Sequence, residues 1–257
     1  MLALDRWALN RARSLQREIV AAYDSYSFHV IYQRLHQFCS VDLGGFYLDV
    51  LKDRVYTASA DSRARRSAQT AMYYLLEALA RWMAPILSFT AEEIWRNMPG
   101  NRGASVLLET WYTLPEDTTQ VELTSEVYWV KVLAVREQVA RELEKARVAG
   151  VLGASLEAEV DLFVDAELHT LLAKLGDELR FVLITSEARI HDLAANLSVG
   201  IETGLKGLRV QVNPSAHAKC ARCWHRRADV GANSEHPQLC ARCVTNVAGQ
   251  GEVRRIA

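Results

Sequence analysis

Apolar residues recur every three or four positions through the first hundred residues, which is the pattern of helices that pack by one face. The pattern predicts helices over about residues 4–26, 28–38 and 46–55. Gly44-Gly45 is the least expected pair for a helix, so it puts helical continuity near that point in doubt. The apolar faces consist of Leu4, Trp7, Ala8, Ala12, Leu15, Ile19, Ala22 and Tyr26, then Phe28, Ile31, Tyr32, Leu35 and Phe38, then Phe46, Tyr47, Val50, Leu51 and Val55.

A long fourth helix is expected after Asp61-Ser62, and Pro85 should end or kink it because proline removes a helical hydrogen bond. Thr90 and Glu93 have the spacing of a capping box for a short fifth helix, which Pro99-Gly100 would end. Four or five helices with short joins describe a bundle, in which the aromatic residues are expected to be core. The inward face of the fourth helix is predicted to consist of Ala68, Ala71, Met72, Leu75, Leu79, Trp82 and Met83.

Residues 113–120 form the clearest linker, because they are polar and contain one proline between two periodic segments. A further helix is predicted over about 125–147, and Gly150 fits its end. Glu137 and Arg141 lie four residues apart on it, a pairing that contributes a few tenths of a kcal/mol. Its apolar face is predicted to include Val130, Leu133, Ala134 and Val139.

After residue 150 the apolar pattern becomes that of strands. Alternation predicts strands around 160–164 and 208–212, and a compact apolar run predicts another at 181–184. Asp165 should cap a short helix that ends near Gly176. The segment is therefore expected to be a small α/β or α+β unit. The apolar positions are Val160, Leu162 and Val164, then Phe181, Val182, Leu183 and Ile184, then Leu208, Val210 and Val212.

Near the end of the chain stand two matching cysteine pairs, Cys220 with Cys223 and Cys240 with Cys243. At this spacing a tight turn aims both sulfurs of a pair at one point, and the residues between the pairs can return to complete a tetrahedron. The pattern predicts one structural zinc ion with no open position for a catalytic water. A disulfide pair would need an oxidising compartment, whereas an iron or iron–sulfur site uses the same ligands and spacing alone does not exclude it. Three nearby histidines are expected outside the ligand set, because four thiols suffice: His217, His225 and His236.

The composition is that of a soluble globular protein with enough material for about two domains: 257 residues, 50% hydrophobic and 24% charged. A net charge of −1 gives no overall attraction to nucleic acid, so a basic binding surface must be local. Four of the five cysteines fall in the metal pattern and Cys39 stands alone, which indicates a reducing compartment such as the cytoplasm. No apolar run approaches a membrane span, and the first residues do not have the layout of a signal peptide. The sequence starts inside an amphipathic pattern, so we expect a fragment of a longer protein.

Positive charge is concentrated around the cysteine pairs, although the whole chain is nearly neutral. Lys219, Arg222, Arg226 and Arg227 surround the first pair, next to Trp224. A metal-held knob with clustered arginines and an exposed aromatic ring suits a phosphate backbone and unstacked bases. Two alternatives remain: the arginines only keep a module with little core soluble, and Trp224 packs against the metal loop.

Signatures of catalysis do not occur in the sequence. It contains no GxxxxGK[ST] loop, GxGxxG turn, HExxH helix or GxSxG elbow. The acidic and basic candidates are scattered over helix surfaces. The sequence therefore predicts binding rather than catalysis.

The segments KCARCWHRRADVG and EHPQLCARCVTNVAGQGEVRRIA resemble the C-terminal zinc module of bacterial-type isoleucyl-tRNA synthetases. The helical part is similar to the same family in FCSVDLGGFYLDVLKDRVY and RRSAQTAMYYLLEALARWMAPILSFTAEEIW, and GASLEAEVDLFV and LRFVLITSEARI follow in the family's order. The resemblance covers nearly the whole chain. It implies a mainly α fold: the helical anticodon-binding bundle of class I synthetases over residues 1–114, a small α/β junction domain over 115–213 and a C-terminal four-cysteine zinc finger over 214–257.

The resemblance also implies a role in RNA recognition, away from the chemistry. The parent enzymes charge tRNA(Ile) with isoleucine using ATP and Mg²⁺, but their HIGH and KMSKS motifs and editing insertion do not occur here. This chain is thus expected to be inactive alone, monomeric, and a partner of the catalytic body of its own polypeptide. The family pattern CxRCW falls on Cys220 to Trp224, which assigns Arg222 and Trp224 to the anticodon. Lys219, Arg226 and Arg227 are expected to meet phosphates of the anticodon arm, with neither DNA nor membrane as partner.

Two other classes share part of the pattern. Formamidopyrimidine-type DNA glycosylases carry a very similar finger, but they are expected to begin with proline and glutamate after the initiator methionine, where this chain has Leu2-Ala3. They also begin with a β-rich segment rather than helices. The second alternative is a zinc-dependent protein-interaction module whose arginines meet an acidic partner. Comparing binding to isoleucine tRNA, another tRNA and duplex DNA at one salt concentration separates the three.

Overall fold

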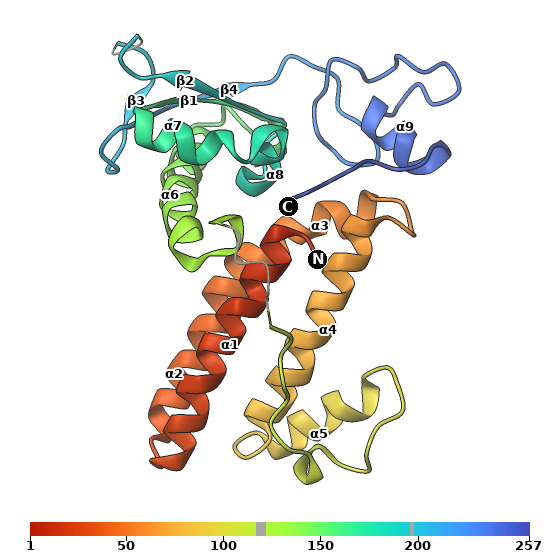
Figure 1. Cartoon of the computed structure of the whole chain (residues 1–257). Coiled ribbons are helices and arrows are strands. Elements are labelled where there is room, and N and C mark those ends of the chain that lie inside the picture. The colour runs from red at the N-terminus through yellow and green to blue at the C-terminus, as the bar shows by residue number, and fades with distance from the viewer. Residues whose placement is uncertain (117–121, 196–197) are drawn as a thin grey trace. The chain divides into compact units, whose positions relative to one another are not determined.

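The computed structural model describes residues 1–116, 122–195 and 198–257 (Figure 1). The chain forms two compact units. The first unit combines Met1–Asp49 with Arg66–Glu126, and the second combines Val50–Arg65 with Val127–Ala257. Within the described residues, no helix combines the length and the apolar character needed to cross a membrane.

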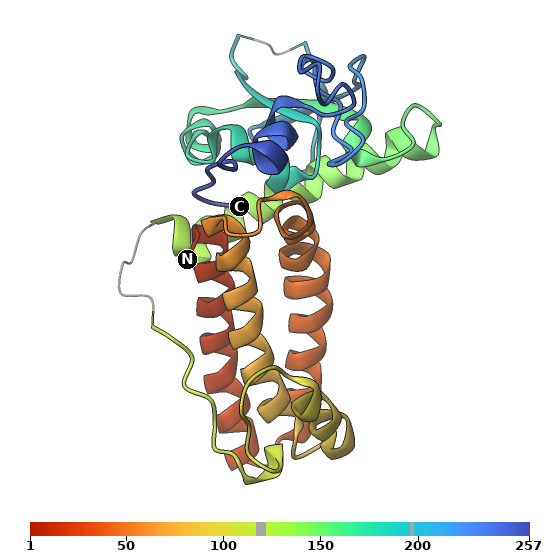
Figure 2. The ribbon, with the colours of Figure 1, turned by 90° about the vertical axis from the view of Figure 1, so that its right-hand side faces the viewer.

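The first unit is helical, as the sequence predicts, and α1 packs along α2 (Figures 1 and 2). Its core combines large residues of α1 such as Leu15 with Trp82 of α4, both almost fully buried. Trp82 donates its ring N–H to Oε1 of Gln16 at 2.9 Å, so its one polar atom is satisfied. The helices that lie wholly or partly in this unit are α1 (Ala3–Asp24), α2 (Phe28–Gln37), the π-helix η1 (Phe38–Tyr47), α3 (Leu48–Thr57), α4 (Arg63–Met83) and α5 (Ser88–Asn97), with the 3-10 turns η2 (Val106–Leu108) and η3 (Glu122–Thr124).

The doubtful Gly44-Gly45 pair lies in the π-helix η1, which follows α2 directly and leads into α3. A Cβ atom on Gly44 would lie 3.0 Å from the carbonyl oxygen of Cys39, and one on Gly45 would lie 3.3 Å from that of Ser40. Both carbonyls are five residues back, where the wider π turn brings the backbone close. The glycines therefore accompany a widened helix rather than a break.

Two expectations for the helical unit are wrong. Thr90 and Glu93 do not form a capping box, because α5 already begins at Ser88 and its N-cap residue, Leu87, has no capping side chain. Some aromatic residues expected to be core are instead exposed, just after α1 and on α2: Tyr26, Phe28 and Tyr32. Pro99-Gly100 follows the end of α5, as predicted.

The second unit contains a four-stranded sheet in the order β2-β1-β4-β3. β1 (Ala158–Val164) is parallel to β2 (Glu187–Asp192) and antiparallel to β4 (Leu208–Pro214), which pairs with the short β3 (Ile201–Glu202). The predicted strands at 160–164 and 208–212 are confirmed, and the Asp165 carboxylate caps the following helix at Leu168 N. The helices of this unit are α6 (Glu126–Val148), α7 (Ala166–Ala173), α8 (Leu179–Leu183) and α9 (Ala241–Ala248), with the 3-10 turns η4 (Ser155–Glu157) and η5 (Gly176–Glu178).

The apolar run at 181–184 is not a strand. It belongs to α8, whose five residues are all buried, and Ile184 ends the helix in the left-handed conformation with φ of 57°. A short run that is apolar on every side does not reveal its period, so the sequence left helix and strand indistinguishable. The strand is β2, whose mixed polar sequence suits its position at the edge of the sheet.

Helix α6 runs over Glu126–Val148, close to the predicted range, but its buried face differs from the predicted one. Val130 is 65% exposed, and Val139 is the one residue of the predicted face that is buried. The face is set by larger neighbours: Tyr128, Trp129, Val132, Val135, Val139 and Leu143 are buried. The predicted linker at 113–120 runs into residues 117–121, which lie outside the described part of the chain.

Candidate zinc centre and the surface around it

The four cysteines of the two pairs come together in the second unit. Their sulfur atoms all lie within 4.8 Å of one another, all four residues are buried, and Sγ of Cys223 lies 3.7 Å from Sγ of Cys240. Zn–S bonds of about 2.3 Å in a tetrahedron separate sulfurs by about 3.8 Å. The sulfurs are free rather than bonded as disulfides. The donor set and spacing therefore fit one structural zinc ion held by four thiolates.

Three of the thiols, those of Cys223, Cys240 and Cys243, ionise as a set rather than independently. Hydrogen bonds from Cys240 and Cys243 lower the pKa of Cys223, and the same interactions with Cys223 raise the pKa of Cys240 and of Cys243. One thiolate therefore forms readily, and each further one is opposed by the charge already present. A divalent cation removes this opposition, so four thiolates at this distance need the ion.

Backbone hydrogen bonds hold the turn of the first cysteine pair and join it to the second pair. Trp224 N donates to the Cys220 carbonyl at 3.0 Å, and Cys220 N donates to the His225 carbonyl at 2.9 Å. Cys240 N donates to Sγ of Cys220 at 3.4 Å, which links the second turn to the first. The second pair is extended into α9, which begins directly after Cys240.

Trp224 is presented to solvent rather than packed against the metal loop. Its side chain is 60% exposed, and Nζ of Lys219 lies 5.7 Å from the ring centroid. Its backbone is left-handed, with φ of 66°, a conformation that bulky residues rarely adopt. The result is an aromatic ring with a cation beside it, held on a metal-stabilised loop.

The arginines predicted around the first cysteine pair already have protein partners. Arg226 donates to Oε1 of Glu157 at 3.0 Å, and Arg227 to Oε2 of Glu187 at 2.6 Å. Arg222 donates to backbone carbonyls of Tyr56 and Thr57 at the C-terminal end of α3. All three side chains are partly exposed, and their assignment to RNA stays a prediction.

A charged cluster that sequence reasoning missed lies beside the metal site. Asp53 of α3 accepts two hydrogen bonds from Arg242 at 2.7 and 2.8 Å and a further one from Arg254. Burial alone would raise the pKa of Asp53, but these hydrogen bonds and charges outweigh it and hold the pKa well below its usual range. Glu252 also accepts from Arg242 and Arg254. Nothing local in the sequence marks Asp53, because its partners lie 189 and 201 residues further on.

The three histidines differ in their surroundings, and in the described residues the candidate ligand set contains only the cysteines. His225 is buried, with its ring edge on Phe181 and Nδ1 3.9 Å from Oδ1 of Asp53. His217 is exposed and lies near Glu159, and His236 is partly exposed. This agrees with the expectation that none is a zinc ligand.

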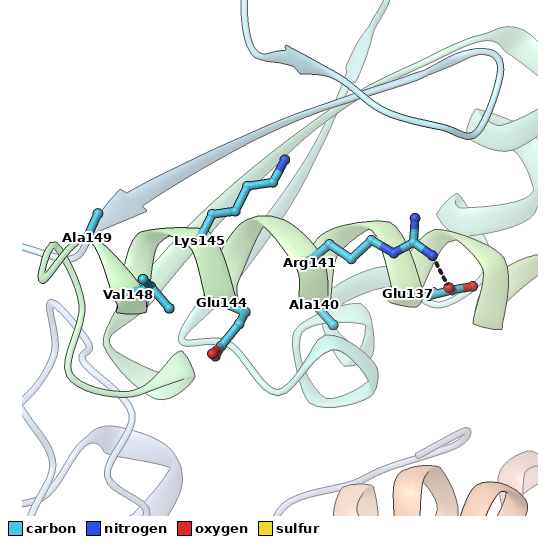
Figure 3. A pocket seen from close by; sticks show the side chains of 7 residues that line it. All are labelled: Glu137, Ala140, Arg141, Glu144, Lys145, Val148 and Ala149. Carbon is cyan, nitrogen blue, oxygen red and sulfur yellow. Dashed lines mark hydrogen bonds and ion pairs between the residues drawn. The ribbon is translucent and has the colours of Figure 1, made fainter.

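A groove lies along α6 (Figure 3). Its lining comes from α6, and its charged residues include Glu137 and Arg141, which form an ion pair at 2.5 Å. The polar groups spread along one helix face rather than converging on a point, so the groove has no arrangement for binding or catalysis. The lining consists of Glu137, Ala140, Arg141, Glu144, Lys145, Val148 and Ala149.

Two families match the chain. The anticodon-binding domain of tRNA ligase matches residues 5–162, and the zinc finger found in FPG and IleRS matches residues 219–246, which include all four cysteines. The match to the finger agrees with the sulfur geometry and supports zinc over iron.

Curated relatives similar to the chain are isoleucine–tRNA ligases. Those of Nitrosococcus oceani and Thioalkalivibrio sulfidiphilus are each 56% identical to it, over 257 and 260 residues, and that of Halorhodospira halophila is 57% identical over 263 residues. All of this chain is covered, but it spans only 27–28% of their length. On the match over residues 5–162, the chain belongs to the family of anticodon-binding domains of tRNA ligases.

Proposed function

We propose that this chain is the tRNA-binding part of an isoleucine–tRNA ligase and that its zinc finger recognises the anticodon arm of tRNA(Ile). The observation that carries the proposal is Trp224, an exposed ring in a strained backbone on a zinc-stabilised loop. Anticodon bases are single-stranded and can be splayed out to stack on such a ring. The family match and the similarity to isoleucine–tRNA ligases supply the partner.

The residues divide into two kinds of contact. Trp224 stacks on a base, and Lys219 beside it meets a phosphate, which orients the RNA without reading its sequence. Arg226 and Arg227 each donate one N–H group to a glutamate. Each guanidinium has five N–H donors, so others are available to bind phosphates. Arg222, assigned to the anticodon by resemblance, already donates to α3, and its role is taken up below.

The ligase chemistry belongs to the remainder of the parent polypeptide. There, tRNA(Ile) is charged with isoleucine using ATP and Mg²⁺, and this chain acts only by holding the RNA. The purified chain should accordingly show no isoleucine-dependent pyrophosphate exchange, and a measurable rate would refute this assignment. We further propose that the chain is monomeric and cytoplasmic, with domains at 1–114, 115–213 and 214–257, which sedimentation and limited proteolysis can check.

The test is the affinity for a fluorescent tRNA(Ile) transcript, measured by anisotropy at several salt concentrations. Trp224→Ala should weaken binding about 5- to 150-fold, the range for one stacked base, with little change in the salt slope. Lys219→Ala should reduce the salt slope by about one phosphate contact. Val247→Ala, which trims an exposed apolar residue elsewhere on the finger, is the matched control and should bind like wild type.

Several outcomes would overturn the proposal. If Trp224→Ala binds as tightly as wild type, the stacking assignment is wrong. If the wild-type chain prefers duplex DNA to tRNA at equal salt, the glycosylase reading replaces it. If it binds neither nucleic acid, the zinc-dependent protein-interaction reading is favoured.

A further inference from the structure

The two cysteine turns have the same sequence, Cys-Ala-Arg-Cys, with an arginine before the second ligand in each. These two arginines, Arg222 and Arg242, both reach the same helix. Arg242 forms a two-pronged ion pair with Asp53 of α3, and Arg222 donates to the Thr57 and Tyr56 carbonyls where α3 ends. The matching positions of the two turns therefore share one docking surface, the C-terminal part of α3 within the second unit.

The contacts of Arg242 are too buried to be incidental surface pairs. The side chains of Asp53, Arg242 and Arg254 are 16%, 11% and 1% exposed. Buried charges persist only when they are paired and hydrogen-bonded, and a lost partner leaves the others uncompensated. Asp53 is the acceptor shared by both arginines, so it is the centre of this contact.

The contact of Arg222 uses a different feature of α3. The last carbonyls of a helix lack partners within the helix and carry the negative end of its dipole. A guanidinium there satisfies two of these carbonyls and brings a positive charge to the favourable end. Arg222 therefore caps the C-terminal end of α3 and at the same time attaches the first cysteine turn to it.

The same cluster extends to the residue that follows Trp224. The ring of Phe181 lies under the guanidinium carbon of Arg254, with 3.5 Å to the ring centroid, and under that of Arg242, with 5.1 Å. The edge of His225 packs on the same ring. Phe181 thereby joins His225 to Arg242 and Arg254, the two arginines that bind Asp53. The preceding residue, Trp224, is exposed.

We propose that Asp53 is a positioning residue for RNA recognition: through Arg242 and Arg254, with Arg222 as a second attachment, it fixes the orientation in which the zinc finger presents Trp224. This inference rests on the proposed function of Trp224. It assigns the two matching arginines to attachment of the finger rather than to solvent or RNA. Asp53 itself contacts no RNA in this arrangement.

The test is a double-mutant cycle between Asp53→Asn and Trp224→Ala in the full chain, read out as affinity for the tRNA(Ile) transcript. Asp53→Asn should retain one zinc per chain by mass spectrometry under native conditions, yet weaken binding at least about fivefold, the lower end for one lost stack. Because Asp53 acts through Trp224, its substitution should have little further effect in the Trp224→Ala chain. Asp177→Asn, the same change at an exposed residue of the second unit, should bind like wild type.

Failures of the two ideas are distinguishable. If Trp224→Ala weakens binding but zinc-loaded Asp53→Asn binds like wild type, or if the two losses multiply, the positioning role is overturned and the proposed function stands. If the wild-type chain does not bind the transcript, the proposed function falls and this inference falls with it. Should Asp53→Asn lose its zinc, Arg242→Lys replaces it, because lysine keeps the charge but not the two-pronged bond. Wild-type affinity in that variant would overturn the inference, and a loss that vanishes without Trp224 would support it.

Discussion

The interiors of the helical unit and of the zinc finger are stabilised by different interactions. In the first unit, apolar faces of long helices meet, and residues such as Leu15, Ile19 and Trp82 are almost completely buried. In the finger, the corresponding cluster within the described residues consists of four cysteines, with Val230 and Leu239 packed against them. A module of this size cannot bury enough apolar surface to be stable. A metal ion and buried ion pairs of arginines therefore replace the apolar core. The stability of the first unit is thus spread over many residues, whereas that of the finger depends on a few.

The largest difference between the two regions is expected when the metal is removed. A structural zinc contributes about 10–16 kcal/mol to a finger, so chelation should unfold the segment from about residue 214 and leave the bundle standing. Limited proteolysis with mass spectrometry should show new cleavage in that segment, while far-UV circular dichroism retains the helical signal. Cys240→Ser should behave like the chelated chain.

Cys39→Ser is the matched control, because Cys39 is exposed and lies outside the ligand set. It should keep the zinc and the sensitivity to chelator. Loss of the bundle together with the finger would contradict the separate origins of their stability. So would a metal-free chain with an ordered C-terminal segment.

A second prediction concerns Glu77, a buried carboxylate in the helical unit. It pairs with Arg81 and Arg102, each at 2.6 Å. Burial would raise its pKa, but hydrogen bonds from Arg102, Tyr73 and Arg81 outweigh this and lower the pKa to about 2. A lowered pKa contributes stability above the ordinary value of about 4.5 that is lost as pH falls toward 2, here about 3 kcal/mol. The helical unit therefore also contains a charge-dependent site.

Glu77→Gln should lower the free energy of unfolding at pH 6 and flatten its decline between pH 4.5 and 2. Urea unfolding followed by circular dichroism measures both, with chelator present at every pH so that zinc release does not contribute. Glu93→Gln, at an exposed position of α5, should leave the pH profile unchanged. A Glu77→Gln profile parallel to that of wild type would show that this carboxylate does not stabilise the unit.

The smallest effect is expected at Glu137 on α6. Its ion pair with Arg141 joins two side chains that are each 60% exposed, so solvent screens it. Glu137→Gln should change the free energy of unfolding by only a few tenths of a kcal/mol. A loss above about 1 kcal/mol in thermal unfolding would contradict the screening of this ion pair by solvent.

Local patterns were enough for much of the fold. The period of the apolar residues predicted where α1, α4 and α6 begin and end, although not the buried face of α6. Asp165 was recognised as a cap because a capping residue acts within one turn. The same approach failed at the run 181–184, most of which lies in α8, because every residue of the run is apolar and no period is visible. It also missed β2, because a polar edge strand is defined by the neighbouring β1 rather than by its own sequence.

By itself, the sequence predicted a four-cysteine metal site, since two thiol pairs in tight turns bring four ligands to one point. The spacing left iron open, and the match to the zinc finger supports zinc. The sequence also predicted that Trp224 and the charges around it form the candidate surface. Only the tertiary structure decided where the charged groups go: Arg222 onto the end of α3, and Arg242 and Arg254 onto Asp53. The reason is that a turn or a helix is encoded by neighbouring residues, whereas an ion pair depends on which distant segments folding brings within a few ångströms.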